Sequence, residues 1–338
     1  MKQSILKSTF KFLAGLVVIQ IAILLTYYVW PAASVDLSYD YPSIPTSVQQ
    51  LEQYVQQKES SIKNIKKGNA ATIIWADSTK SKTEYALVYL HGFSASHEEG
   101  GTVHRQIAEH FGMNLFLSRL SHHGLEGVDG MLELSPQSLM DSALEAVAIG
   151  NCLGKKVILM GTSTGATLGL PIMANDPSIF AGIFYSANIK LADSKSALLT
   201  KPFGLSIARK VLGSNYYSFD SPPGADQYWT TKYPIEATIA LQKLINSSIS
   251  KETFSNIDQS VLLVSYYKDE NNQDEVVSVE AIKNCYDELG TKIGKKKYVE
   301  LTEVGGHAMC SPFFSKDVVS PYEEAREFLE TNLKLTPN

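Results

Sequence analysis

Short apolar runs alternate with amphipathic stretches along most of this chain. The runs are continuous in hydrophobic residues, which is typical of strands that are buried on both faces of a parallel sheet. We therefore predict strands at residues 71–76, 85–90, 114–120, 156–160, 181–187, 261–267 and 297–304.

Between these runs, hydrophobic residues recur at the spacing of helices. Val103, Ile107 and Phe111 are four residues apart, as the members of one apolar helix face would be. Similar stripes occur at Leu139, Ala143 and Val147, at Ile282, Cys285 and Leu289, and at Ala325, Leu329 and Leu333. Because strands and helices alternate, the chain is predicted to belong to the α/β class, with a doubly wound, mostly parallel sheet and helices on both faces.

The interval at about residues 190–257 interrupts this rhythm, because it contains no clear strand pattern. So long an interval is not expected to be without structure inside a compact domain. We predict a mostly helical cap, inserted into a single α/β sheet domain over residues 69–338. The aromatic residues of the cap are candidates either for a substrate pocket or for packing the cap onto the sheet: Tyr216, Tyr217, Tyr228 and Trp229.

The N-terminal part of the chain differs from the rest. Lys2, Lys7 and Lys11 precede an uncharged apolar run over residues 12–30, which is long enough to cross a bilayer as a helix. Lysines before the run and acidic residues after it predict a cytoplasmic segment 1–11, a single-pass anchor 12–30 and an extracytoplasmic catalytic domain. Residues 31–68 are predicted to form a linker and a helical spacer. A cleaved signal peptide is the alternative.

The motif Gly161-Thr162-Ser163-Thr164-Gly165 is the clearest chemical signal. It follows a predicted apolar strand and precedes a helical pattern rich in small residues. A strand-turn-helix at this point would place Ser163 in a strained corner, with its hydroxyl above the edge of the sheet, and the flanking glycines would keep other side chains out of that corner. Ser163 is therefore the candidate nucleophile.

A serine hydroxyl needs a base to take its proton, and His307 is the histidine best placed for this role. It follows Gly305-Gly306 in the loop after the last predicted strand. His122 and His123 follow another strand and either line the site or form an exposed turn. The histidines on or near the first amphipathic stretch are expected to be solvated: His97, His104 and His110.

Two further groups are needed for catalysis. An acid should orient His307, and Asp269 and Asp274 both follow the strand at 261–267. Backbone amides should stabilise the developing oxyanion, and the amides of Phe93 and Thr164 are the candidates. Phe93 follows His91-Gly92 at the end of a buried strand, where His91 is expected to hold the loop by hydrogen bonds instead of taking part in the reaction.

The order of these features resembles the α/β-hydrolase superfamily over about residues 71–335, and residues 119–124 resemble the Arg-x-x-His-Gly loop of monoacylglycerol-lipase-like and carboxylesterase members. The resemblance implies ester hydrolysis through an acyl-enzyme, with Ser163 as nucleophile and His307 as proton shuttle. It leaves the acid open. Counted from the strand end, Asp269 lies where members place their acid, but Asp274 opens a segment similar to the family's Asp-x-Val-Val-Pro turn. We favour Asp274, because burial of Val276 and Val277 would fix it.

Composition excludes several other classes of function. The net charge of −5 and the lack of a basic, aromatic-rich stripe argue against a nucleic-acid partner. The three cysteines have no metal-ligand spacing, so we expect no metal, no cofactor and no disulfide framework. The leading prediction is an esterase that acts on small-molecule or lysolipid-like acyl esters. A serine peptidase, for which Asp193 and Asp226 could hold a free amino terminus, and a non-catalytic binding protein are the alternatives.

Overall fold

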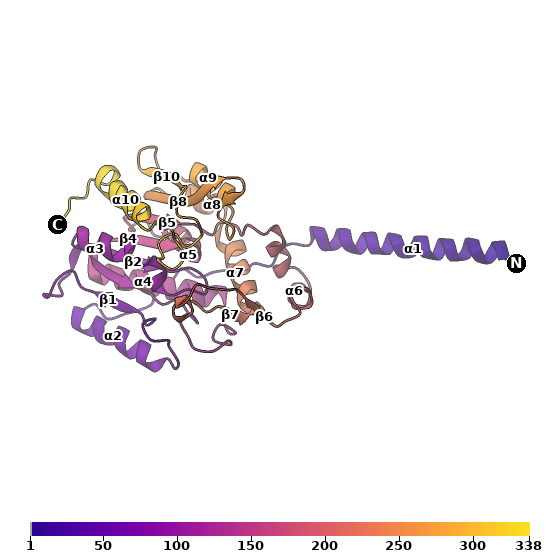
Figure 1. Ribbon diagram of the computed structural model, residues 1–338, viewed down its shortest axis with the longest axis horizontal. Helices are drawn as coiled ribbons and strands as arrows, with labels where there is room; N and C mark the ends of the chain where they lie inside the picture. Colours follow the sequence, from indigo (N-terminus) through magenta and orange to yellow (C-terminus); the bar gives the residue numbers. More distant parts are fainter. Residues whose placement is uncertain (1) are drawn as a thin grey trace.

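The computed structural model describes the backbone of residues 2–338, and the side chains of all of these except residues 2–9, 12, 23, 24 and 28. Strands and helices alternate around one large sheet (Figure 1). Its strand order is β1-β3-β2-β4-β5-β8-β10. The eighth strand, β9, pairs with β8 outside this order. The strands are β1 (Thr72–Ile74), β2 (Thr83–Leu90), β3 (Asn114–Leu117), β4 (Gly154–Thr162), β5 (Ala181–Tyr185), β8 (Ser260–Asp269), β9 (Asn272–Gln273) and β10 (Lys296–Leu301).

The sheet is mostly parallel, as the sequence predicts. Among the described strands of this sheet, only β1, at one edge, and the two-residue β9 run antiparallel to their neighbours. Parallel pairing places the carboxyl ends of β2, β4, β5, β8 and β10 at one edge of the sheet. In such sheets, ligands bind at this edge.

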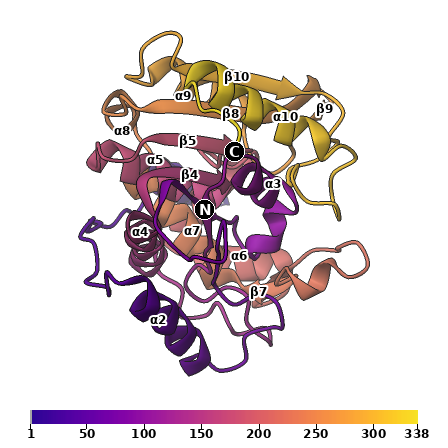
Figure 2. The same cartoon turned by 90° about the vertical axis from the view of Figure 1, so that its left-hand side faces the viewer.

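Both faces of the sheet are buried, which explains the continuous apolar runs. Along β2, Val88 and Leu90 point into one hydrophobic cluster, whereas Leu87 and Tyr89 point into another. The first cluster includes side chains from α4 (Pro136–Leu153), α5 (Thr164–Asn175) and α9 (Val279–Glu288). The second includes α3 (Val103–His110) and α10 (Val319–Glu327), which lie beside each other (Figure 2). The sheet is therefore doubly wound.

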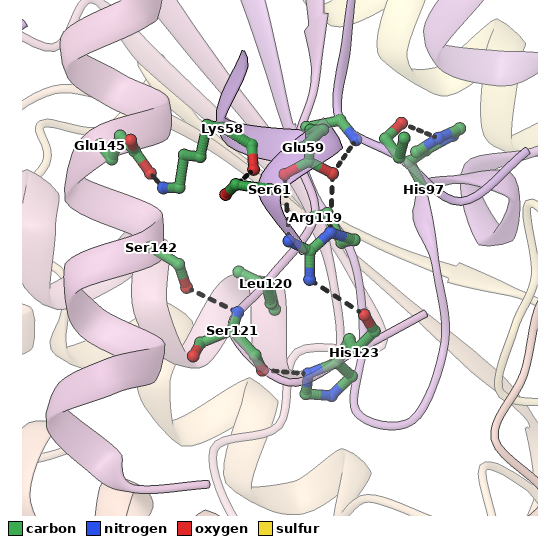
Figure 3. A network of polar contacts seen from close by, with 12 residues as sticks. Lys58, Glu59, Ser61, His97, Arg119, Leu120, Ser121, His123, Ser142 and Glu145 are labelled. Carbon is green, nitrogen blue, oxygen red and sulfur yellow. Dashed lines mark hydrogen bonds and ion pairs between the residues drawn. The ribbon is translucent and has the colours of Figure 1, made fainter. Parts of the chain in front are cut away.

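A helix from the predicted spacer, α2 (Val48–Ser61), packs onto the domain through Leu51 and Val55. Its contact is also polar (Figure 3). Glu59 accepts hydrogen bonds from the Arg119 guanidinium at 2.7 and 3.0 Å and from the Ala71 amide at 2.8 Å. The spacer thus rests on the loop after β3 and does not hold the domain at a distance from residues 2–29.

The interval between β5 and β8 contains α6 (Gly204–Leu212), α7 (Ile235–Ser248), α8 (Lys251–Ser255) and the 3-10 turns η2 (Ser194–Thr200) and η3 (Ala225–Gln227). It also contains an antiparallel ribbon of β6 (Tyr216–Ser218) and β7 (Lys232–Pro234), which the sequence pattern does not reveal. Each strand is only three residues long, and this is too short for a period-two pattern. The predicted mostly helical segment therefore includes a small β ribbon.

The N-terminal segment forms helix α1 (Lys2–Val29), which extends away from the body of the molecule (Figure 1). Among the helices that the structure describes, none combines the length and the apolarity needed to cross a membrane. The predicted anchor at residues 12–30 is thus helical, but a membrane span there is not supported.

Candidate active site

Ser163 lies in the corner between β4 and α5, where the sequence predicts it. Its φ of 53° is in the left-handed region, which is strained for a residue with a Cβ. The corner is tight because a Cβ on residue 165 would lie 1.9 Å from the carbonyl oxygen of Leu90. Glycine at this position lets α5 begin directly against β2. The Ser163 amide donates to Tyr185 at 2.9 Å, which ties the corner to β5.

Asp274 and His307 come together at the same edge of the sheet, from the loops after β9 and β10. The distance from His307 Nδ1 to the Asp274 carboxylate oxygens is 2.8 and 3.0 Å. One of these oxygens also accepts hydrogen bonds from the amides of Val276 and Val277, at 2.9 and 3.1 Å. These amides fix the carboxylate in one orientation toward the imidazole.

The electrostatics of this pair favour an ionised acid beside a histidine that readily takes a proton. Burial on its own raises the pKa of Asp274, but His307 and the two backbone amides outweigh burial and lower this pKa below its ordinary value. Burial likewise lowers the pKa of His307, whereas Asp274 raises it, and the net shift is upward. Because the carboxylate can only accept, Nδ1 carries the proton and Nε2 is left free to act as a base.

Asp269, the alternative acid, is exposed at the end of β8. Its carboxylate accepts hydrogen bonds from the Asn271 amide and the Asn272 side chain. These contacts hold the turn between β8 and β9, so the residues between the two aspartates form a hairpin. The expectation that Val276 and Val277 are both buried is half right, since Val277 is fully buried and Val276 is 46% exposed.

The loop after β2 carries Phe93, the predicted oxyanion residue. Its ring lies edge-on to His123 and Tyr233, with centroids 5.6 and 5.3 Å away. Within the described part of the chain, the amides of Phe93 and Thr164 donate to no other protein group. Both are thus free to donate to a substrate oxygen. His91 holds this loop, as predicted, with Nδ1 at 2.8 Å from the Gly92 carbonyl and Nε2 accepting from Leu120 at 3.0 Å.

The prediction of solvated histidines near α3 is wrong for two of the three. His97 and His104 are buried, whereas His110 is partly exposed. His97 contacts the Ala70 carbonyl at 3.1 Å, and His104 contacts the His97 carbonyl at 2.9 Å. The sequence pattern misses this because the residues before α3 form a 3-10 turn, η1 (His97–Gly100), that packs against β2 and β4. In the loop after β3, His123 is fully buried and His122 is partly exposed.

One buried carboxyl group near the site has no place in the sequence-based prediction. Glu99, on η1, is 2% exposed and accepts a hydrogen bond from the Gly92 amide at 2.5 Å. Burial raises its pKa to about 7, against a smaller lowering by the Gly92 amide and His307. No local motif in the sequence distinguishes the buried Glu99 from its partly exposed neighbour Glu98.

The described residues contain no group of histidine, cysteine, aspartate and glutamate side chains that could hold a metal ion. Cys152, Cys285 and Cys310 are all free thiols. The candidate residues at the carboxyl edge of the sheet provide a hydroxyl, an imidazole, carboxylates and backbone amides. This set suits nucleophilic attack on a carbonyl carbon.

Solved structures provide a comparison with the fold. One of the metagenome-derived lipolytic enzymes LipS and LipT is 14% identical to this chain, with a TM-score of 0.64 over 79% of this chain and 99% of that one. The monoacylglycerol lipase of Paleococcus ferrophilus is 16% identical, with a TM-score of 0.55 over 79% and 98%. Est1E from Butyrivibrio proteoclasticus, with bound ferulic acid, is 16% identical, with a TM-score of 0.54 over 78% and 95%. These proteins are α/β-hydrolases. This chain has the α/β-hydrolase fold.

No protein-family model matches the chain, and no curated protein matches it in sequence. The α/β-hydrolase fold is therefore recognisable from the backbone and from a few local motifs, although the overall sequence has diverged. At identities this low, likeness establishes the fold alone. The activity has to be argued from the residues at the carboxyl edge of the sheet.

Proposed function

We propose that the protein is a serine hydrolase that cleaves carboxylic esters through an acyl-enzyme intermediate. The observation that carries the proposal is the placement of Ser163 in a strained strand-to-helix corner, at the same sheet edge where His307 contacts the buried carboxylate of Asp274. Strain at a non-glycine residue persists only where the surroundings enforce it, and it is frequent at catalytic sites. The lipolytic and esterase names of the structural neighbours agree with this class of reaction.

The first half of the proposed reaction forms the acyl-enzyme. Ser163 Oγ attacks the ester carbonyl carbon while His307 Nε2 takes the hydroxyl proton. The amides of Phe93 and Thr164 donate to the oxyanion of the tetrahedral intermediate. As the intermediate collapses, Nε2 gives the proton to the alcohol oxygen and the carbon–oxygen bond breaks. Asp274 stabilises the imidazolium throughout without becoming protonated.

The second half regenerates the enzyme. A water molecule attacks the acyl carbon, and His307 Nε2 accepts one of its protons. When the second tetrahedral intermediate collapses, the acid product leaves and the proton returns to Ser163 Oγ. Each group thus ends in its starting protonation state, so no cofactor is needed.

We propose an acyl or lysolipid-like ester as substrate, because aromatic side chains surround the loops of the site. Trp229 of the cap lies against Phe313 and Phe314, which follow the His307 loop, with ring centroids 6.2 and 4.9 Å apart. The Thr230 amide donates to the Ser94 carbonyl at 2.7 Å, which joins the cap to the oxyanion loop. An aromatic wall of this kind favours an apolar substituent over a charged one.

No specific observation favours the peptidase alternative. Asp193 and Asp226, the acids that could have held a free amino terminus, are both exposed. Asp193 caps the turn η2 by accepting from the Lys195 amide at 2.9 Å. Its carboxylate therefore has a structural role at the surface of the cap.

The test of the proposed function is labelling of Ser163 by a fluorophosphonate probe, followed by turnover of p-nitrophenyl esters of increasing chain length. Wild-type protein is expected to be labelled and to hydrolyse these esters. The Ser163→Ala variant should lose both properties, whereas Ser255→Ala keeps them, because the exposed Ser255 hydroxyl donates to the Glu252 carbonyl within α8, away from the proposed reaction. Ester turnover by Ser163→Ala at the wild-type rate would reject the proposal.

The location of the protein is a separate proposal, which rests on the sequence alone. We propose that the catalytic domain lies on the extracytoplasmic side of a membrane, because lysines precede the apolar run at 12–30 and acidic residues follow it. Protease added to intact cells should then degrade the catalytic domain. Complete protection of the domain, with degradation only after lysis, would contradict this location.

A further inference from the structure

Glu99 links the loop after β2 to the ends of β2 and β4 at the candidate active site. Its Oε2 accepts the Gly92 amide of the oxyanion loop at 2.5 Å and lies 3.4 Å from the hydroxyl of Tyr89 on β2. The Tyr89 hydroxyl is in turn 3.0 Å from Thr162 Oγ1, on the residue directly before Ser163. One carboxyl group therefore contacts the loop that carries Phe93 and, through Tyr89, the strand end that carries the nucleophile.

The position of Glu99 is set by its local structure. Ser96 begins the turn η1, and its hydroxyl accepts from the Glu98 amide, so the turn has a defined start. Glu99 packs so closely on the loop that a Cβ on residue 92 would lie 2.7 Å from Glu99 Oε1. Glycine at position 92 is what allows the carboxyl group to reach the loop backbone.

The neighbouring Glu98 points the other way and provides an internal comparison. It forms an ion pair with Arg105 at 2.6 Å, and both side chains are partly exposed. Burial acts to raise the pKa of Glu98, but His97 and Arg105 lower it to about 2. Two adjacent glutamates on one turn thus have different environments, and only Glu99 faces the active site.

Glu99 is also coupled electrically to the catalytic histidine. The charge of Glu99 adds to that of Asp274 in raising the pKa of His307, and His307 in turn lowers the pKa of Glu99. The other titratable groups that face Glu99 are Tyr89 on β2 and Cys310 in the loop after β10, and burial keeps both neutral by raising their pKa values. His307 is therefore the group whose charge responds most directly to Glu99.

We propose that Glu99 is a positioning residue, which fixes the oxyanion loop through the Gly92 amide and, when ionised, adds a second negative charge to that of Asp274 near His307. Removing the carboxyl group frees the Gly92 amide, and the loop then no longer aims the Phe93 amide at the oxyanion. Loss of one oxyanion donor costs about 10²- to 10³-fold in kcat, so a misaimed donor is expected to cost up to this factor. This inference rests on the proposed ester hydrolysis, because it assigns a role within that reaction.

The experiment compares Glu99→Ala, Glu99→Gln and the matched control Glu98→Gln. We expect Glu99→Ala to lower kcat at least about tenfold, with KM changed by less than about threefold, because the loop acts on the transition state more than on substrate binding. Glu99→Gln retains an oxygen that can accept from Gly92, so it should recover most of kcat. Glu98→Gln should match wild type. Wild-type kcat in folded Glu99→Ala would overturn the proposal.

The charge gives a second readout that a purely structural role would not change. Since Glu99 raises the pKa of His307, Glu99→Gln should lower that pKa and move the acidic limb of kcat/KM to lower pH. In the control Glu98→Gln, the acidic limb of kcat/KM should stay at the wild-type pH. An acidic limb at the wild-type pH in folded Glu99→Gln would also overturn the proposal. If neither variant folds, Glu99→Asp keeps the charge but shortens the reach to Gly92. Glu99→Asp should then have a lower kcat than wild type, while the acidic limb of kcat/KM stays at the wild-type pH. A wild-type kcat in this variant would contradict the positioning role of Glu99.

The failure of this inference can be told apart from failure of the proposed function. Titration of the His307 imidazole, followed by nitrogen-15 NMR, reports the effect of Glu99 without any turnover. If wild-type protein neither hydrolyses esters nor reacts with the fluorophosphonate, the hydrolase proposal fails. If wild-type protein is active but His307 titrates identically in wild type and Glu99→Gln, only the role of Glu99 fails.

Discussion

The carboxylate of Asp274 lies 2.8 Å from Nδ1 of His307, although 33 residues separate them in the chain. The contact exists because β8 and β10 are parallel neighbours, whose carboxyl ends meet at one edge of the sheet. The loops that leave the two strands therefore place an acid and a base side by side. Amide donors from Val276 and Val277 keep the acid ionised and oriented.

This contact gives the first prediction, which compares the two aspartates of the loop. Asp274→Asn should lower kcat by about 10⁴, because the amide no longer holds His307 in the tautomer that leaves Nε2 free. Asp269→Asn should leave kcat unchanged within about twofold, since that side chain contacts only the hairpin. Steady-state kinetics with one ester, and a thermal melt of each variant, decide the matter. The reverse ranking would make Asp269 the catalytic acid.

The second prediction concerns pH. The reaction needs neutral His307, whose pKa is raised above its ordinary value chiefly by Asp274, acting against burial. The activity should therefore rise with pH through a pKa above that of a free histidine. In Asp274→Asn the raising charge is gone while burial remains, so the residual activity should begin at lower pH. Profiles of kcat/KM between pH 4 and pH 9 measure the acidic limb in wild type and in Asp274→Asn. A limb at higher pH in the variant than in wild type would contradict this explanation.

Two of these residues show why part of the site could be predicted from the sequence. Ser163 and Asp274 lie in short motifs, whose flanking glycines or valines report the local backbone. His307 was recognised from its place after the last strand, since strand order fixes which loops share an edge. For Ser163 and Asp274 this information lies within about five residues of the candidate group, whereas for His307 it lies in the order of the strands.

Glu99, His97 and His104 could not be predicted in this way. Their burial depends on the 3-10 turn η1, which packs against β2 and β4, and nothing in the local alternation of polar and apolar residues indicates this burial. The ribbon β6–β7 was missed because three-residue strands carry no period. Groups that local structure or strand order positions can thus be predicted from the sequence, whereas polar groups that are buried by tertiary packing cannot.

The third prediction concerns how far kcat falls when the proposed nucleophile, Ser163, is removed. Ser163→Ala should lower kcat by about 10⁶, as does loss of the nucleophile in other triads. The variant should also fold at least as stably as wild type, because alanine removes only a hydroxyl and the left-handed backbone is held by hydrogen bonds of residue 163 to Tyr185 and Asn188. Activity on a sensitive ester and a urea unfolding curve measure the two effects. A residual rate within about tenfold of wild type would point to a different nucleophile.

The last prediction concerns the ion pair between Glu59 and Arg119, which anchors α2 to the loop after β3. Both side chains are buried, at 9% and 5% exposed, and the carboxylate also accepts the Ala71 amide (Figure 3). Removing one partner of a buried pair leaves an uncompensated charge, which costs about 3–5 kcal/mol. Glu59→Gln should therefore lower the free energy of unfolding by an amount of this order.

The matched control is Glu52, on the same helix. It pairs with Lys80 at 2.9 Å, and both of these side chains are about a third or more exposed. Exposed pairs contribute about 0–1 kcal/mol, so Glu52→Gln should change the free energy of unfolding only slightly. Urea unfolding of the two variants separates the cases, because the residues lie on one helix and differ in burial. Equal effects would mean that the Arg119 contact does not hold α2 on the domain, and the helix would then be held by its other contacts, which include Leu51, Val55 and the ion pair of Lys58 with Glu145.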